Sequence, residues 1–322
     1  MNFYFILFVL FPNFFVSSII VRKSEIIPSL ENVTPRGNFS SHDTLLLLAP
    51  PLTFNWCDNN GRNYCVPMKN QHIPQYCGSC WCVSATQALS TRINIKRNNT
   101  GELIVLSCQH VLNCGNVGSC YGGSIDSVYQ FISSTPISYE TSMPYIACSS
   151  DSTEGFCKYT DTTCKNVNIA RACGGFEGSQ KDDNACIGLK YYPNATISDY
   201  GSISGKSAMQ KEIYNNGPII CGIDAEPLLQ YTGGVINTAG KSVDHVVEVV
   251  GWGTNYWIVR NTWGQYWGMN GYVYVQFGSL LIEDQCSWAI PDTFTTTDNY
   301  PCYENGSNCL IKEDLPILIS AA

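Results

Sequence analysis

The sequence predicts an α+β protein made of two lobes that share a cleft. Helical patterns dominate the first half, whereas short β-branched and aromatic runs bounded by glycines begin at about residue 197. A chain of 322 residues with 44% hydrophobic residues can form a large core or two subdomains. We therefore expect a helical lobe over about 52–165 and a β lobe over about 187–292.

Three helices are predicted in the first half. The segment 82–93 carries small residues suited to a helix packed tightly on both sides, 106–114 begins at Ser107 as a plausible N-cap, and 126–133 is short. A further turn or two of helix is expected at 209–214. Strands are expected at 218–223, 245–252, 256–260 and 271–277, and the polar region 140–190 is expected to consist of loops held by disulfides.

Composition restricts the classes of partner and compartment. The net charge is −8 and no basic run is long enough to follow a phosphate backbone, so nucleic acid is not an expected partner. Seventeen cysteines without paired metal-ligand spacings indicate a disulfide framework in an oxidising compartment, with no metal and no cofactor expected. The odd count leaves at least one thiol, and Cys80 is the natural candidate.

The N-terminal region suggests a secretory route to a lysosomal or extracellular destination. Residues 1–18 have signal-peptide length, with an uncleaved anchor as the alternative, and no stable membrane span is expected after removal. Residues 19–51 are interpreted as a short propeptide or a flexible linker, 52–292 as the compact body and 293–322 as a C-terminal extension. Five glycosylation sequons fit this route: Asn32, Asn38, Asn98, Asn194 and Asn305.

The motif Cys-Gly-Ser-Cys-Trp at 77–81 supplies a candidate nucleophile. Cys80 precedes a predicted helix, where unpaired N–H groups and the helix dipole favour a thiolate. A nucleophilic thiol needs a base and a group that orients the base. The sequence must therefore provide both elsewhere.

Elimination among four histidines favours His245 as the base. His42 lies in the predicted propeptide, His110 lies among apolar helix residues and suits a structural role, and His72 lies in a proline-containing loop. His245 opens a strand of the β half, although a strand-end histidine is ordinarily structural. The downstream aromatic run favours the catalytic reading, because Asn261 can fix the tautomer of the imidazole and Trp263 can shield that bond from water.

Over residues 52–292 the chain resembles the papain-like cysteine peptidases, and within them the cathepsin X (cathepsin Z) branch. The resemblance implies a papain-like fold with a helical domain, a β-barrel-like domain and the active site in the cleft between them. It assigns Cys80 as nucleophile, His245 as base and Asn261 as the orienting amide. It also assigns Gln71 to the oxyanion hole. Substrate-binding positions implied by the resemblance are Gly122, Gly123, Trp263 and Trp267.

Gln71 lies nine residues before Cys80, whereas the family spacing is six. Treating His72-Ile73-Pro74 as inserted restores the spacing, and Gln75 fits less well. Such an insertion is typical of the cathepsin X branch, in which its histidine is thought to meet the C-terminal carboxylate of the substrate. The resemblance therefore implies a carboxypeptidase that releases single residues from substrates with a free C-terminus. His72 as an ordinary exposed loop residue is the alternative.

Several positions depart from the family pattern. The base follows the nucleophile by 165 residues (245 − 80), and we place the extra length in the loops at 149–186. No cysteine precedes Cys57, so a propeptide cysteine that caps the thiol is absent from the printed sequence. Cys82 and Cys108 are expected to be buried free thiols.

The disulfide expectations come from two sources. The turn at 59–61 suggests that Cys57 and Cys65 could pair, and Cys302 with Cys309 is a possible bridge. The resemblance implies three further bonds: Cys77–Cys120, Cys221–Cys286, and Cys114 with Cys157 or Cys148.

Three functions are therefore weighed. The leading one is a monomeric, cysteine-type carboxypeptidase that acts through a thioester intermediate. The alternatives are a broader papain-like endopeptidase and a catalytically silent homologue that binds or adheres. The sequence retains both nucleophile and base, which favours an active enzyme.

Overall fold

The computed structural model describes residues 24–27, 50–173, 186–299 and 303–304. The α-helices are α1 (Cys80–Lys96), α2 (Cys108–Cys114), α3 (Ser127–Ile132), α4 (Asn166–Ile169) and α5 (Lys206–Asn216), with short 3-10 turns η1 (Trp56–Asp58), η2 (Gly155–Tyr159) and η3 (Glu226–Gln230). The strands are β1 (Phe54–Asn55), β2 (Gly118–Ser119), β3 (Gly122–Gly123), β4 (Ile137–Ser138), β5 (Arg171–Cys173), β6 (Cys186–Gly188), β7 (Asn194–Ile203), β8 (Ile219–Ile223), β9 (Val235–Ile236), β10 (His245–Trp252), β11 (Tyr256–Arg260), β12 (Tyr272–Gln276) and β13 (Cys286–Phe294).

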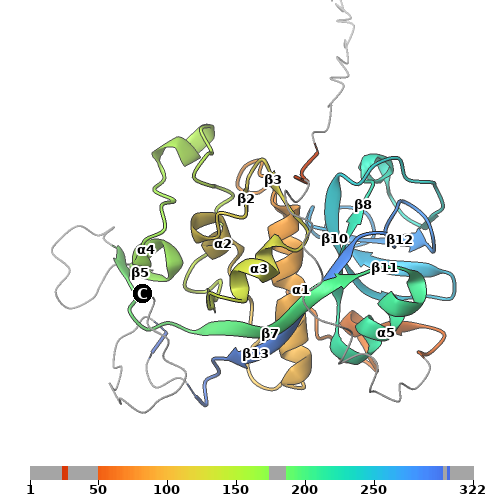
Figure 1. Cartoon of the computed structure of the whole chain (residues 1–322), viewed down its shortest axis with the longest axis horizontal. Coiled ribbons are helices and arrows are strands. Elements are labelled where there is room, and N and C mark those ends of the chain that lie inside the picture. The colour runs from red at the N-terminus through yellow and green to blue at the C-terminus, as the bar shows by residue number, and fades with distance from the viewer. Residues whose placement is uncertain (1–23, 28–49, 174–185, 300–302, 305–322) are drawn as a thin grey trace, which may run out of the picture.

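The predicted α+β class is confirmed. Figure 1 shows α2, α3 and α4 on one side, the strands β8 to β12 on the other, and α1 standing between them. The predicted strands of the second half pair in the order β8-β10-β11-β12, all antiparallel. Their alternating apolar residues fill a core of their own beneath α5.

Helix α1 is buried along nearly its whole length. Small side chains at Ser84, Ala85 and Ala88 let neighbouring elements approach from both sides, as the sequence predicts. The helix begins at Cys80, two residues earlier than expected, and Ser84 donates to the carbonyl of Val246 in β10 at 3.1 Å. The first turn of α1 is thereby held against the β lobe.

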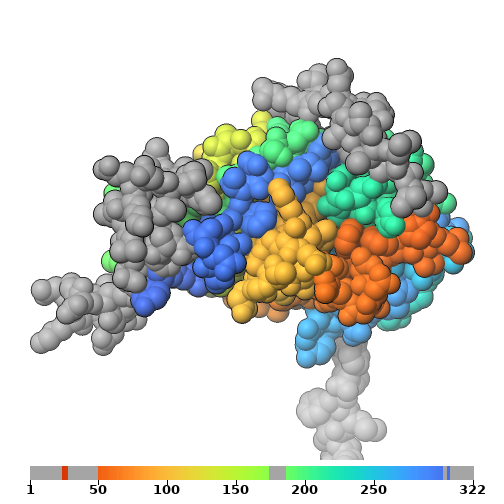
Figure 2. Space-filling view, turned by 90° about the horizontal axis from the view of Figure 1, so that it is seen from below, coloured from red at the N-terminus to blue at the C-terminus, as the bar shows by residue number. Residues whose placement is uncertain are grey.

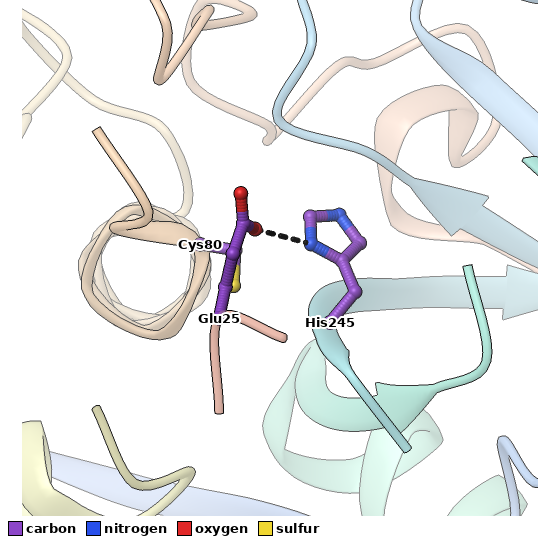
Figure 3. Close-up of side chains that lie close together, drawn as sticks. All are labelled: Glu25, Cys80 and His245. Carbon is purple, nitrogen blue, oxygen red and sulfur yellow. Dashed lines mark hydrogen bonds and ion pairs between the residues drawn. The ribbon is translucent and has the colours of Figure 1, made fainter. Parts of the chain in front are cut away.

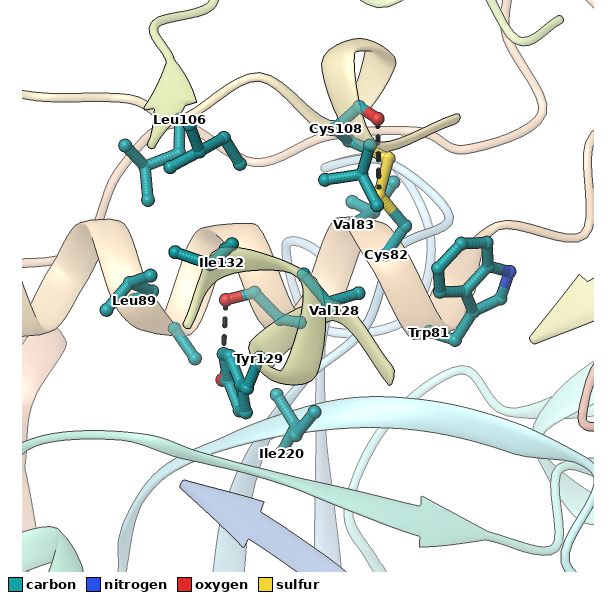
Figure 4. Close-up of a cluster of buried hydrophobic side chains, with 14 of the residues drawn as sticks. Trp81, Cys82, Val83, Leu89, Leu106, Cys108, Val128, Tyr129, Ile132 and Ile220 are labelled. Atoms are coloured by element: carbon teal, nitrogen blue, oxygen red, sulfur yellow. Dashed lines mark hydrogen bonds between the residues drawn. A yellow bond between two sulfur atoms is a disulfide. The ribbon is translucent and has the colours of Figure 1, made fainter. Parts of the chain in front are cut away.

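Helices α2 and α3 cover the other side of α1 (Figure 4). Leu89 of α1 packs in one cluster with Val128 and Ile132 of α3. Ser107 caps α2, because its hydroxyl accepts from the His110 N–H. The two short helices depend on this packing, since isolated helices of their length are marginal in water.

The two lobes are less separate along the sequence than expected. Strands β7 and β13 form a long antiparallel ribbon that runs beneath both lobes (Figure 1). Ala195, Ile197 and Ala289 of this ribbon pack into the helical-lobe core, whereas Trp288 packs into the β-lobe core. The sheet also continues to Phe294, beyond the predicted end of the body at 292.

A buried ion pair ties α1 to the β lobe. Arg92 and Glu212 of α5 meet at 2.8 Å with both side chains fully buried. The same guanidinium donates to the carbonyls of Pro218 and Ala289, so its charge is surrounded by acceptors. Removing one member would leave a buried charge without compensation, which destabilises strongly.

Seven disulfides join described cysteines, and two expectations are wrong. Cys82 and Cys108 are bonded to each other, because the first turn of α1 packs directly on the start of α2. Cys114 pairs with Cys164 and not with Cys157 or Cys148, which bond to each other. Cys114 stands at the end of α2, which packs on the α4 region that Cys164 precedes.

The remaining pairs are Cys57–Cys65, Cys77–Cys120, Cys173–Cys186 and Cys221–Cys286. The first was suggested by the intervening turn, and the second and fourth are those implied by the family resemblance. Cys302 and Cys309 lie outside the described residues.

The sequons differ in accessibility. Asn194 opens β7, is 4% exposed, and donates its side-chain amide to the Tyr192 carbonyl, so a glycan cannot be carried there in the folded chain. The prediction at this position is therefore wrong. Asn98 is exposed after the end of α1. Asn32, Asn38 and Asn305 lie outside the described residues.

The lower face is closed by segments distant in sequence. Figure 2 shows the end of α1 between the residues that follow position 50 and the blue end of β13. Lys96 donates to the Pro291 carbonyl, and Arg62 donates to the side chain of Asn98. In the described part of the chain, helices of a length and apolarity suited to crossing a bilayer are not found.

His110 predicts a loss of stability in acid. Burial lowers the pKa of His110 to about 4, and its Nδ1 accepts from the Ser138 N–H, so the folded state holds the neutral ring. The unfolded chain takes up a proton at the ordinary value of 6.5, and folding stability therefore falls as the pH drops from about 6.5 to about 4. The expected loss from this residue is about 3 kcal/mol.

Urea unfolding of wild type and His110→Gln at pH 7 and pH 4 tests this. We expect the variant to be less stable at pH 7, because the ring packing is lost, but to show a smaller decrease on acidification. Identical decreases in the two proteins would contradict the assignment.

Candidate active site

Cys80 lies at the first position of α1 and is fully buried. It keeps its thiol, whereas every other described cysteine forms a disulfide. The N–H of Val246, the second residue of β10, points at the Cys80 Sγ across 3.4 Å. The positive end of the helix dipole and this additional donor both favour negative charge on sulfur.

His245 begins β10 and is fully buried beside this thiol. Its Nε2 lies 2.8 Å from Asn261 Oδ1, which also accepts from the Thr262 N–H at 2.8 Å. An atom that accepts from a backbone N–H must be the amide oxygen, so Nε2 carries the hydrogen of this bond. The second nitrogen, Nδ1, is then directed toward the Cys80 side of the ring.

Two tryptophans cover the His245–Asn261 bond. The indole of Trp263 lies 5.1 Å from the His245 ring between centroids, and Trp267 packs edge-on against Trp263 at 5.2 Å. Asn261 is fully buried as a result. A hydrogen bond that water does not reach is stronger and better oriented than an exposed one.

The loop before the nucleophile pairs with the turn after Asn261. Gln71 N–H donates to the Thr262 carbonyl at 2.8 Å, and Asn70 forms a bridge with Trp263. The Gln71 amide is fully buried, accepts from the Thr262 hydroxyl and donates to the Cys77 carbonyl at 3.0 Å. These bonds fix which end of the amide faces the cleft, and that end is the NH2 donor.

Tyr145 is a positioning residue that sequence reasoning missed. Its hydroxyl donates to the Gln71 carbonyl at 2.7 Å and lies 2.6 Å from the hydroxyl of Ser79. Burial raises the pKa of Tyr145, so the hydroxyl remains a donor. Tyr145 therefore ties the Gln71 loop to the residue before Cys80, and a lone tyrosine in the loop region carries no sequence signal for such a role.

Glu25 is the second residue that sequence reasoning missed. Figure 3 shows its carboxylate between the start of α1 and the His245 ring. Oε2 lies 3.1 Å from His245 Nδ1 and accepts from Gln71 at 3.2 Å, and the side chain is 2% exposed. Its only signal in the sequence is an acid within the predicted propeptide.

The backbone around Glu25 is paired with β3. The Gly123 N–H donates to the Glu25 carbonyl at 3.2 Å, and the Ile27 N–H donates to the Gly123 carbonyl at 3.1 Å, in a parallel bridge. A Cβ at Gly122 would lie 2.7 Å from the Glu25 carbonyl oxygen, so only glycine admits the segment this closely. The predicted glycine pair therefore binds an extended chain in this structure.

The insertion and the residues just after it place two side chains on the far side of the carboxylate. The Tyr76 hydroxyl donates to Glu25 Oε1 at 3.2 Å, and His72 Nε2 lies 3.9 Å from the same oxygen. The rings of His72 and Tyr76 stack with centroids 4.8 Å apart. His72 was a sequence prediction, whereas Tyr76 was not, because an aromatic residue four positions later gives no indication of stacking.

The assembled groups can perform acyl transfer. A thiolate beside an imidazole with a fixed tautomer can attack a carbonyl, and the imidazole can then protonate the leaving amine. The Gln71 NH2 and the backbone N–H groups at the start of α1 can stabilise the oxyanion that forms. The predicted residues Cys80, His245, Asn261 and Gln71 are thus brought together from both lobes.

Comparison with known proteins agrees with this geometry. The family model described as papain family cysteine protease matches residues 50–291. Cathepsin Z of Onchocerca volvulus is 37% identical over 258 residues, spanning 75% of this chain and 78% of the relative. Procathepsin L of Rattus norvegicus is 32% identical, spanning 71% of this chain and 61% of the relative.

Among solved structures, the digestive procathepsin L2 proteinase from the larval midgut of Tenebrio molitor superposes with a TM-score of 0.60. That alignment covers 83% of this chain and 78% of the other, at 22% sequence identity. The similarity at this identity concerns the fold.

Gln71 and Gln75 give a direct test of the oxyanion assignment. Gln71→Ala is expected to lower kcat for peptide hydrolysis by about 10²–10³-fold, because one oxyanion donor is lost. Gln75→Ala should lower kcat much less, because its amide contacts Cys157 Sγ in the neighbouring disulfide loop. Equal losses in the two variants, measured with a fluorogenic peptide and N-terminally processed protein, would contradict the assignment.

Proposed function

This chain belongs to the papain family of cysteine proteases, and we propose that within this family it acts as a carboxypeptidase that releases single residues. Cys80 attacks the terminal peptide carbonyl, His245 protonates the leaving amino acid, and water hydrolyses the thioester. Asn261 orients His245, and Gln71 with the Cys80 backbone N–H stabilises the oxyanion.

One observation carries the proposal: the cleft already holds a carboxylate beside the reacting groups. Oε2 of the Glu25 carboxylate lies beside His245 and Gln71. Oε1 lies beside Tyr76 and His72. A carboxypeptidase must bind an α-carboxylate one residue beyond the scissile carbonyl. His72 and Tyr76 are suited to this role, because they supply a protonatable ring and a hydroxyl at the carboxylate oxygen that does not contact His245.

The shape of the insertion agrees with this role. His72 is about one-third exposed and is held by stacking on Tyr76, while its backbone N–H donates to the Asn70 side chain at 2.9 Å. Gln75 reaches the Cys148–Cys157 loop, which braces the insertion from outside. A braced loop can close the cleft to a longer chain while presenting a cationic group to a free C-terminus.

The carboxylate anchor is tested with matched peptides that end in a free acid or an amide. We expect processed enzyme at acidic pH to remove one residue from the free acid and to leave the amide intact. His72→Ala should lower kcat/KM for the free acid about 10–100-fold, the value of a charge-assisted hydrogen bond. Ile73→Ala, an exposed neighbour in the same loop, serves as the control.

Other outcomes favour other functions. Internal cleavage of both peptides, detected by mass spectrometry, would indicate an endopeptidase. No cleavage of either, with no labelling of Cys80 by a thiol-directed epoxide, would indicate a silent binding homologue. If the amide is also cleaved, an equal loss of kcat/KM for the free acid and for the amide in His72→Ala would contradict the role of His72 as a carboxylate anchor.

We further infer that residues 19–51 form a propeptide and that residues 24–27 block the cleft in the unprocessed chain. Glu25 fills the reacting centre, and its backbone occupies the glycine pair that would bind an extended substrate. Seven disulfides among the described residues favour an oxidising compartment on the secretory route, lysosomal or extracellular. We propose that the enzyme acts as a monomer.

The block predicts protection of the thiol. In the uncleaved chain, Glu25→Ala should speed alkylation of Cys80 by iodoacetamide by about tenfold or more, because charge-assisted hydrogen bonds that hold the segment are lost. Glu102→Ala, at an exposed position beyond the far end of α1, should leave the rate unchanged. An unchanged rate in Glu25→Ala, determined by mass spectrometry over time, would show that the segment does not control access.

A further inference from the structure

We propose that the unprocessed chain binds one Zn²⁺ ion between Glu25, Cys80 and His245. One donor atom from each side chain, a carboxylate oxygen, the thiol sulfur and an imidazole nitrogen, lies within 4.8 Å of the others, and all three residues are buried (Figure 3). The inference rests on the proposed blocked state, because Glu25 supplies the third ligand only while the N-terminal segment occupies the cleft.

The donor set favours zinc over other common cations. Zn²⁺ takes thiolate, imidazole and carboxylate ligands, whereas Mg²⁺ and Ca²⁺ require oxygen ligands. Ligand atoms of a tetrahedral zinc site lie about 3.3–3.7 Å from one another. The separation of Glu25 Oε2 from His245 Nδ1 is 3.1 Å, so this pair needs only a small adjustment to admit the ion.

His245 is prepared as a ligand by its neighbour. Because Asn261 Oδ1 accepts from Nε2, Nδ1 is the nitrogen that faces Glu25 Oε2 and the cluster, and zinc would replace the proton that these two atoms share. Zinc-bound histidines ordinarily donate their other nitrogen to an oxygen acceptor, which orients the ring and raises its basicity. The Thr262 N–H holds that oxygen in place.

The carboxylate is prepared in the same way. Gln71 donates to Oε2 and Tyr76 donates to Oε1, so each oxygen is held in a fixed orientation. The backbone of the segment is held at the Asp244 carbonyl by the Glu25 N–H, at 3.1 Å. Water or Glu25 Oε1 can take the fourth position, and the Cys80 thiol releases its proton to solvent on binding.

The experiment measures metal binding by the uncleaved chain, purified at neutral pH and checked by intact mass. Zn²⁺ is titrated against a chromophoric chelator, and Co²⁺ serves as a second probe because thiolate ligation gives a charge-transfer band. We expect one Zn²⁺ per chain and a thiolate–cobalt band. Both should be lost in Cys80→Ser.

Glu25→Gln is the decisive variant. Since removal of even an indirect partner of a metal ligand costs about 10–100-fold in affinity, loss of this ligand should weaken Zn²⁺ binding by at least about tenfold. Glu102→Gln, in the exposed turn beyond the far end of α1, should bind as wild type does. Processed enzyme that lacks the segment should match Glu25→Gln.

Control measurements separate a missing ligand from a misplaced segment. Alkylation of Cys80 without zinc reports whether the segment stays docked in Glu25→Gln, and Glu25→Asp, which keeps the carboxylate, should bind Zn²⁺ more tightly than Glu25→Gln. Equal affinity in wild type and Glu25→Gln, or no thiolate band, would overturn the zinc site.

The zinc result is independent of the reaction specificity. Peptide cleavage is measured separately, on processed enzyme after chelation. Failure to trim a free C-terminus would overturn the carboxypeptidase proposal and leave the binding data standing. If Zn²⁺ affinity does not depend on Glu25 while the processed enzyme still releases the C-terminal residue, only the metal site would be overturned.

Discussion

The active site depends on the contact between the start of α1 and the start of β10. Ser84 donates to the Val246 carbonyl, and the Val246 N–H points at the Cys80 sulfur. These two contacts join elements from different lobes, with the proposed nucleophile on one and the proposed base on the other. Because α1 is buried on all sides, the helix cannot shift without disturbing both cores, and the separation of thiol and imidazole is therefore set by packing.

Much of this arrangement could be predicted from the sequence. The strand around His245 shows a β-branched run, and Ser107 and Cys80 occupy positions at which the chemistry of a helix start is recognisable. These signals are local, since each depends on a few neighbouring residues. Gln71 could be recovered only by treating three residues as inserted, which required a family pattern.

The features that the sequence did not predict depend on distant contacts. Cys82 and Cys108 form a bond because two helices cross at their N-termini, and nothing in their spacing indicates that crossing. Glu25 and His245 are 220 residues apart and meet only through the fold. The absence of paired metal-ligand spacings argues only against a zinc motif made of neighbouring residues. A site made from residues 25, 80 and 245 has no sequence spacing that could be recognised.

The β7–β13 ribbon links the two lobes that form the cleft. Since its residues pack into both cores, and Arg92 joins α1 to both α5 and β13, the lobes share a continuous pair of strands and buried polar contacts. The positions of the two lobes are therefore coupled, because separating them would break these buried contacts. For the proposed blocking segment, release then requires breaking its own bonds to Asp244, Gly123 and Gln71.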